Sequence, residues 1–173
     1  HLGLLTKEQI DNEYYKNGTF IGGQFTTKIP KSLYNSGSLG HVLGIGAGIA
    51  LAAKLDKKNE KVYIVLGDGE MQEGSKYEAA EFAARHKLNN LIGIIDYNQL
   101  WVTGSSNTTD QQLADRFHVL GWDTIIINGH DLEILQYELT AGENSPRMII
   151  CKTVKGKVVK KMENESFSHH GIL

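Results

Sequence analysis

Four short apolar runs are distributed along the chain. They cover residues 62–66, 91–95, 124–127 and 148–151, and they contain many β-branched side chains without polar alternation. Runs of this kind are typical of strands covered on both faces of a sheet. Helical segments are predicted between them, at residues 75–86, 111–120 and 132–141. Asp110 and Asp131 precede the last two helices, and Gly142 ends the final one.

The alternation of strand and helix predicts an α/β fold. Successive strands joined through helices favour right-handed crossovers and a mainly parallel sheet with helices on both faces. Residues 39–53 carry small and apolar side chains on every face, which predicts a buried helix packed closely on both sides. Residues 1–35 are expected to be loop-rich apart from a short helix within residues 6–16.

Length and composition fit one globular domain. The chain has 173 residues, of which 40% are hydrophobic and 22% charged, so we expect a single domain over residues 1–173. The sequence starts at His1 without an initiator methionine, which leaves the position of the true N-terminus open.

Charge and cysteine content exclude several classes of function. The formal net charge is −2 and no basic patch with interleaved aromatic residues is visible, so nucleic acid is not an expected partner. No apolar stretch approaches the roughly 20 residues of a membrane helix. The single cysteine, Cys151, lies in the last apolar run, so we expect a buried thiol and a reducing compartment such as the cytoplasm.

Two polar motifs directly follow the first two predicted strands. Gly67-Asp68-Gly69 follows the first strand, and Asp96-Tyr97-Asn98 follows the second. Ligands of parallel sheets bind at the carboxyl ends of the strands, so Asp68 and Asn98 are expected side by side. The glycines would let backbone N–H groups approach an anionic group such as a phosphate. Taken alone, the first tripeptide favours a simple turn, because turns after strands often have this composition.

The side chains of these motifs offer only oxygen ligands. One carboxylate and one carboxamide, together with a backbone carbonyl and phosphate oxygens, suit Mg²⁺ or Ca²⁺. No soft ligand is present that would favour zinc.

The same residues carry a family resemblance. The segment 67–74, GDGEMQEG, followed by Asp96-Tyr97-Asn98, resembles the thiamine diphosphate signature, and Gln72-Glu73-Gly74 resembles its transketolase branch. Segments 36–41, 128–131, 152–157 and 169–171 agree with that family in the same order. The resemblance runs from residue 36 to residue 171 and implies the thiamine-diphosphate-binding fold.

The resemblance implies a site for thiamine diphosphate and Mg²⁺, or Ca²⁺. The implied metal ligands are Asp68, Asn98 and the backbone carbonyl of Leu100. The implied cofactor-binding residues are Gly37 and Leu39 at the aminopyrimidine, Gly69, which donates its N–H to the diphosphate, and also Gly67 and Glu70. His170 is placed near the diphosphate and the reacting carbon, and is therefore implied both in cofactor binding and in catalysis.

Glu73 and Glu78 match carboxylates that link two active sites across a dimer interface. A second interpretation is that they are solvated residues at a helix start, where carboxylates are favourable regardless of function. His170 has a surface position as its alternative, and His41 a packing role. His86, His118, Trp101 and Trp122 are interpreted as structural. His130 with Asp131 is interpreted as a loop-to-helix cap.

The resemblance also implies a partner. In this family a glutamate on a second domain contacts the pyrimidine, and that domain does not fit in 173 residues. We expect a second chain carrying the pyrimidine-binding domain, in a hetero-oligomer built on a dimer of the active unit. The alternative is that the chain is a piece of a longer enzyme.

The favoured function is transfer of a two-carbon ketol unit from a ketose donor to an aldehyde acceptor. The alternatives are another thiamine diphosphate enzyme, either decarboxylating 2-oxoacids or resembling deoxyxylulose-phosphate synthase, a non-catalytic partner chain, or a nucleotide-binding module. Gln72-Glu73-Gly74 favours the transketolase type. A glycine-rich G-x-G-x-x-G turn is missing after Leu66, which argues against nucleotide binding. Residues 22–25 lack the Gly-His pair of sugar-phosphate enzymes, so the substrates stay open.

Overall fold

The computed structural model describes residues 3–101, 104–142 and 144–166. The chain divides into two compact units, His1–Leu39 and Gly40–Leu173, and each is described by itself. The expectation of a single domain stays a prediction.

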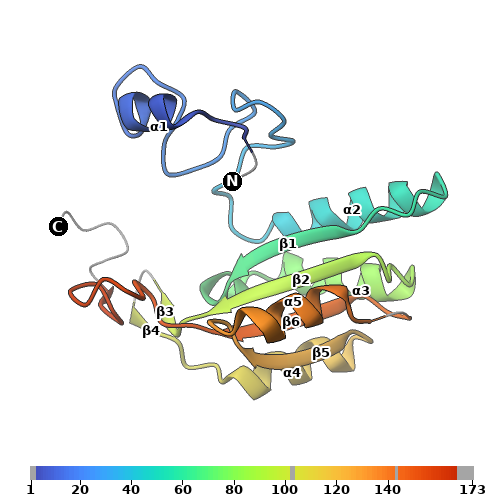
Figure 1. Cartoon of the computed structure of the whole chain (residues 1–173). Helices are drawn as coiled ribbons and strands as arrows, with labels where there is room; N and C mark the ends of the chain where they lie inside the picture. The colour runs from blue at the N-terminus through green and yellow to red at the C-terminus, as the bar shows by residue number, and fades with distance from the viewer. Residues whose placement is uncertain (1–2, 102–103, 143, 167–173) are drawn as a thin grey trace. The chain divides into compact units, whose positions relative to one another are not determined.

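The second unit is built on a four-stranded parallel sheet (Figure 1). The strands are β1 (Val62–Gly67), β2 (Leu91–Tyr97), β5 (Asp123–Asn128) and β6 (Arg147–Lys152), in the order β1-β2-β6-β5. The predicted α/β class and the four predicted strands are therefore confirmed.

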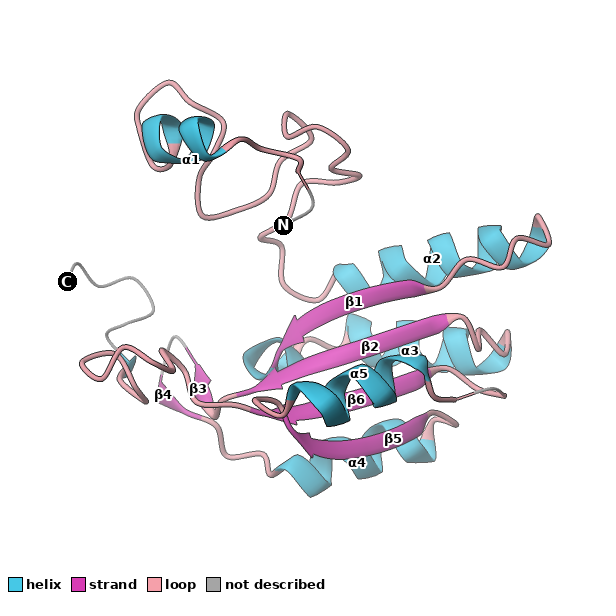
Figure 2. Ribbon diagram, in the orientation of Figure 1, coloured by secondary structure: helices cyan, strands magenta, loops and turns pink. Residues whose placement is uncertain are grey.

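Helices lie on both faces of this sheet (Figure 2), although one face of β1 stays exposed at Tyr63 and Val65. The larger core joins the sheet to α2 (Val42–Leu55), α3 (Ser75–Arg85) and α4 (Asp110–Val119). The smaller core joins its other face to α5 (Leu132–Thr140). Neighbouring residues of one strand serve opposite cores, as Ile149 and Ile150 of β6 do, because successive side chains of a strand point to opposite faces.

The helix starts follow local capping chemistry. Asp131 caps α5, accepting hydrogen bonds from the N–H groups of Glu133 and Ile134, as expected for a loop-to-helix cap. The N-cap of α4 is Thr109 rather than Asp110, because Thr109 and Gln112 form a reciprocal capping box.

Helix α2 is buried on one side within the described residues. Leu43 and Ala50 are fully buried, whereas Ile49 is 37% and Leu55 73% exposed. The expected burial on both sides is therefore wrong for this unit. The small residues at Gly46 and Ala47 serve one close contact with the sheet, where a Cβ at Gly46 would lie 2.7 Å from Ile64 Cγ2.

The first unit is loop-rich, as predicted. Its helix, α1 (Lys7–Glu13), is shorter than the expected segment. Thr6 and Gln9 form its capping box, and the chain leaves the helix at Tyr14, which is extended. Tyr15 then adopts a left-handed conformation with φ of 55°, which is incompatible with a right-handed α-helix, so the helix cannot continue.

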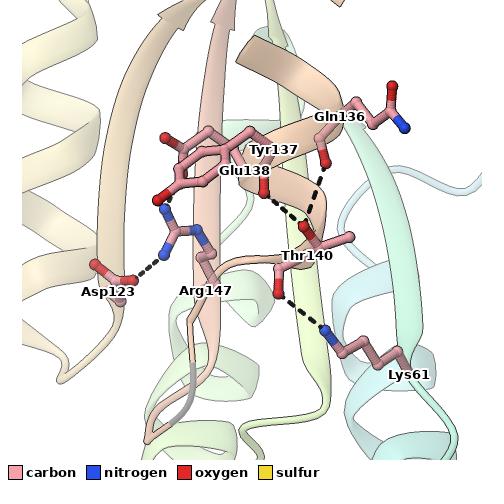
Figure 3. Close-up of polar contacts among 7 residues, drawn as sticks. All are labelled: Lys61, Asp123, Gln136, Tyr137, Glu138, Thr140 and Arg147. Carbon is pink, nitrogen blue, oxygen red and sulfur yellow. Dashed lines mark hydrogen bonds and ion pairs between the residues drawn. The ribbon is translucent and has the colours of Figure 1, made fainter. Parts of the chain in front are cut away.

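An ionic cluster holds the amino end of the sheet together (Figure 3). Arg147, at the start of β6, pairs with Asp123 of β5 and with Glu138 of α5. The Arg147 and Glu138 side chains are 10% and 9% exposed. Close by, the Lys61 ammonium donates to the carbonyl of Thr140 at 3.3 Å.

Within the described ranges, no helix is long and apolar enough to cross a membrane.

Cys151 is buried in β6, and its thiol is expected to resist alkylation. Burial, together with the charge of Asp96, raises the pKa of Cys151 from 9.0 to about 11. At pH 8 the folded chain should hold about 100-fold less thiolate than a chain with an ordinary thiol. Mass spectrometry after iodoacetamide treatment should show slow labelling of the folded chain and rapid labelling in urea. Rapid stoichiometric labelling of the folded chain would contradict the buried position.

Candidate functional site

The carboxyl end of β1 leads directly into the 3-10 helix η1 (Asp68–Gln72), which presents Asp68. The Asp68 side chain is buried, and its Oδ2 accepts the N–H of Gln99 at 2.8 Å. Burial raises the pKa of Asp68, while the N–H groups of Gln99 and Gly69 act in the opposite direction. A cation beside Asp68 would offset this cost of burying a carboxylate.

The turn after β2 brings Asn98 to the same edge of the sheet. Gly67 of β1 lies opposite Asp96 of β2. Gln99 has φ of 63°, a left-handed conformation that closes a tight turn. The Leu100 N–H donates to Asn98 Oδ1 at 3.0 Å, and Asn98 Nδ2 donates to Asp96 Oδ2 at 3.2 Å. The expected proximity of the two motifs is therefore present.

The side chain of Trp101 packs against Gly69. A Cβ on Gly69 would lie 3.2 Å from Cδ1 of the indole ring, so glycine keeps this backbone accessible. The Trp101 Nε1 donor is buried and has no hydrogen-bond partner among the described residues. An unpaired buried donor beside Gly69 suits an anionic group. Trp101 lies in β3 (Leu100–Trp101), which pairs with β4 (Gly104–Ser105); the sequence predicted neither strand.

The donor set fits a hard divalent cation. Asp68, Asn98 and the carbonyl of Leu100 would supply oxygen only, which suits Mg²⁺ or Ca²⁺. Across residues 3–101, 104–142 and 144–166, no group of three His, Cys, Asp or Glu side chains could hold a metal. The expected metal ligands include only one side chain of these four types, Asp68. A search for such clusters therefore does not test this site.

The Glu70 carboxylate is directed into the protein. It accepts the N–H groups of Gly40 and Gly67, both at 3.2 Å. Lys76 Nζ lies 3.4 Å from Glu70 Oε1, and the Lys76 side chain is fully buried. Burial lowers the pKa of Lys76, and the Glu70 charge opposes that shift. Sequence reasoning missed Lys76, although its four-residue and seven-residue spacing to Ala80 and Ala83 places it on the buried stripe of α3.

The remaining expected site residues fall into three groups. Glu73 and Glu78 are exposed, at the end of η1 and in the first turn of α3. Gly37 and Leu39 belong to the first unit and are also exposed there. His170 lies outside the described residues.

A cavity of about 520 Å³ lies at the opposite, amino end of the sheet. Two of its lysines donate hydrogen bonds to carbonyl groups at helix ends: Lys54 to those of His86 and Lys87, and Lys61 to that of Thr140. Lysines are favourable at helix carboxyl ends for this reason. The cavity therefore follows from helix capping, and the candidate site is at the other edge.

Comparison with known proteins places this arrangement in a family. Residues 35–173 match the family model described as "Transketolase, thiamine diphosphate binding domain". The chain is 37% identical over 175 residues to one of the subunits of apulose-4-phosphate transketolase from Phocaeicola vulgatus, covering 98% of this chain and 62% of the relative. It is 38% identical to human transketolase over 149 residues, which cover 83% of this chain and 24% of the relative.

Solved transketolase structures show the same fold. The enzyme from Campylobacter jejuni matches with a TM-score of 0.71 at 32% identity, over 78% of this chain and 23% of that one. A variant from Pichia stipitis matches with a TM-score of 0.78 at 26% identity, over 88% of this chain and 25% of that one. The chain thus belongs to the transketolase family, and residues 35–173 correspond to its thiamine diphosphate binding domain.

Proposed function

We propose that the chain is the thiamine diphosphate and Mg²⁺-binding part of a transketolase-type enzyme. It would transfer a two-carbon ketol unit from a ketose donor to an aldehyde acceptor. The observation that carries this proposal is the meeting of Asp68 and the Asn98 turn at adjoining strand ends. The family membership supports the cofactor.

Each group of residues would have a separate task. Asp68, Asn98 and the Leu100 carbonyl would hold the metal, and the Gly69 N–H would bind the diphosphate. Trp101 would shield that contact from water. Thiamine diphosphate supplies the carbanion chemistry at its thiazolium carbon when it is bound.

Three further residues have proposed roles in catalysis. His170 would lie near the diphosphate and the reacting carbon. The exposed Glu73 and Glu78 would face a neighbouring protomer and link two active sites. Their exposure in this chain leaves both carboxylates available for such a contact.

A second chain would complete the enzyme. The chain spans 62% of its Phocaeicola vulgatus relative and about a quarter of human transketolase, for which the covered share is 24%. The bacterial relative is one of the subunits of its enzyme, which supports a separate partner that carries the pyrimidine-binding domain here. The active assembly would then be a hetero-oligomer built on a dimer.

Reconstitution tests this proposal. The pure chain should show no ketol transfer from a ketose to an aldehyde, because the pyrimidine-binding half of the site is missing. Addition of a purified partner with thiamine diphosphate and Mg²⁺ should produce transfer, followed by chromatographic detection of the lengthened sugar. A chain with Glu73→Gln and Glu78→Gln should lose activity in the mixture. Robust transfer by the pure chain would contradict the need for a partner.

A further inference from the structure

A buried charge lies against the turn that carries Asp68. The Lys76 side chain is 0% exposed, and its Nζ lies 3.4 Å from Glu70 Oε1. The ammonium makes no hydrogen bond of good geometry among the described residues. Lysines are almost never fully buried unless they are paired, because removing the charge from water is costly. The position of Lys76 is therefore tied to the Glu70 carboxylate.

Glu70 uses both of its oxygens to join two chain segments. Oε2 accepts the N–H of Gly67, at the end of β1, and Oε1 accepts the N–H of Gly40, which precedes α2. The carbonyl of Gly40 accepts the Ser75 hydroxyl at 2.9 Å, so both backbone polar groups of Gly40 are hydrogen-bonded. A Cβ on Gly40 would lie 2.7 Å from Ser75 Oγ. The junction is therefore closely packed as well as hydrogen-bonded.

The geometry points to Glu70 and Lys76 as a positioning pair for the cofactor turn. Glu70 fixes Gly67, and with it the adjoining Asp68 and Gly69, while Lys76 neutralises the carboxylate that does so. The inference rests on the proposed function, and it gives Glu70 a role through the turn in place of direct contact with the cofactor.

The neutralising role follows from the charge of the ligand. A carboxylate two residues from Asp68 repels a diphosphate, and the repulsion is stronger at a partly buried site than in water. Lys76 offsets this repulsion from the protein side, where it is shielded from solvent and salt. The Glu70 carboxylate can then hold the turn in place without excluding an anionic ligand from it.

Hydrogen exchange of the chain without cofactor tests the anchor. In Glu70→Gln one carboxamide oxygen replaces two acceptors, so the Gly67 and Gly40 N–H groups lose one partner. Their exchange rates, measured by NMR, should rise by about ten-fold in the variant. A residue that only contacts the cofactor would leave both rates unchanged. Unchanged rates at Gly67 and Gly40 would overturn the inference.

Calorimetric titration of thiamine diphosphate with Mg²⁺ tests the neutralisation. Lys76→Met keeps the apolar stem and leaves the Glu70 charge unpaired, so affinity should fall about ten-fold. Combining Lys76→Met with Glu70→Gln should restore affinity to that of Glu70→Gln alone, because the two charges act as a pair. Lys61→Met, at the opposite edge, should change affinity less than about two-fold. Losses that simply add in the double variant would overturn the pairing.

The titration and the exchange measurement distinguish the proposed function from the positioning role of Glu70 and Lys76. Failure of the wild-type chain to bind the cofactor, with or without its partner, would overturn the proposed function, and the exchange rates of Gly67 and Gly40 would still decide the anchoring role. Should Lys76→Met fail to fold by circular dichroism, the double variant carries the comparison, because it buries no unpaired carboxylate.

Discussion

Asp68→Ala should weaken Mg²⁺-dependent binding of thiamine diphosphate by more than about 100-fold, because it removes the one carboxylate of the proposed metal site. The fold should persist. Burial raises the pKa of Asp68, so the ionised side chain is held at a cost that the alanine variant no longer carries. Calorimetric titration with and without Mg²⁺, in the presence of the partner, measures the loss, and circular dichroism checks the fold.

Two control variants sharpen this experiment. Asp68→Asn keeps an oxygen that can accept the Gln99 N–H but loses the charge, so it should retain stability and still lose the metal dependence. Asp115→Ala removes an exposed carboxylate from α4 and should bind as the wild type does. Binding by Asp68→Ala within about three-fold of wild type would place the metal elsewhere.

Arg147→Met should destabilise the chain by about 3–5 kcal/mol. Its guanidinium pairs with Glu138, whose side chain is 9% exposed, and with Asp123, whose side chain is 45% exposed (Figure 3). Loss of Arg147 leaves the Glu138 carboxylate buried without its counter-charge, which is the expensive part of breaking such a pair. Urea unfolding followed by circular dichroism measures the change in the free energy of unfolding.

A second ion pair provides the matched control. Arg85 pairs with Glu81 on the surface of α3, where the side chains are 72% and 58% exposed. Arg85→Met should therefore cost no more than about 0.5 kcal/mol. Adding Glu138→Gln to Arg147→Met should recover part of the stability, because the buried charge disappears. Equal effects of Arg147→Met and Arg85→Met would show that burial is not what matters.

Much of the fold was accessible from the apolar pattern. The β-branched runs gave all four strands of the sheet. Strands β2, β5 and β6 contribute to the cores on both faces, whereas Tyr63 and Val65 of β1 are 48% and 67% exposed, so the expected cover on both faces is wrong for β1. The helix starts were less accessible. At Thr109 and Asp110 two good capping residues are adjacent, and the choice depends on the reciprocal bond with Gln112. The predicted burial of α2 on both sides was wrong for another reason. Small residues on every face of a helix allow a neighbour to pack closely, but they do not show that a neighbour is there.

The candidate site was accessible only in part. The positions of Asp68 and Asn98 follow from the topology of a strand-helix-strand unit, which returns the chain to one edge. The inward direction of Glu70 depends on Lys76, six residues later, and nothing in the motif itself encodes that pairing. The Trp101 contact with Gly69 depends on the short β3–β4 hairpin, whose strands have two residues each.

The strand order has a consequence for how the chain reaches its folded state. Among the described residues β6 comes last of the strands in sequence, yet it lies between β2 and β5 and pairs with both. Until residue 152 has left the ribosome, β2 and β5 have no common neighbour, and their inner edges stay open. Pairing across this distance in sequence is slow, and open strand edges favour association with other chains. The emerging polypeptide is therefore exposed to aggregation until β6 inserts between β2 and β5.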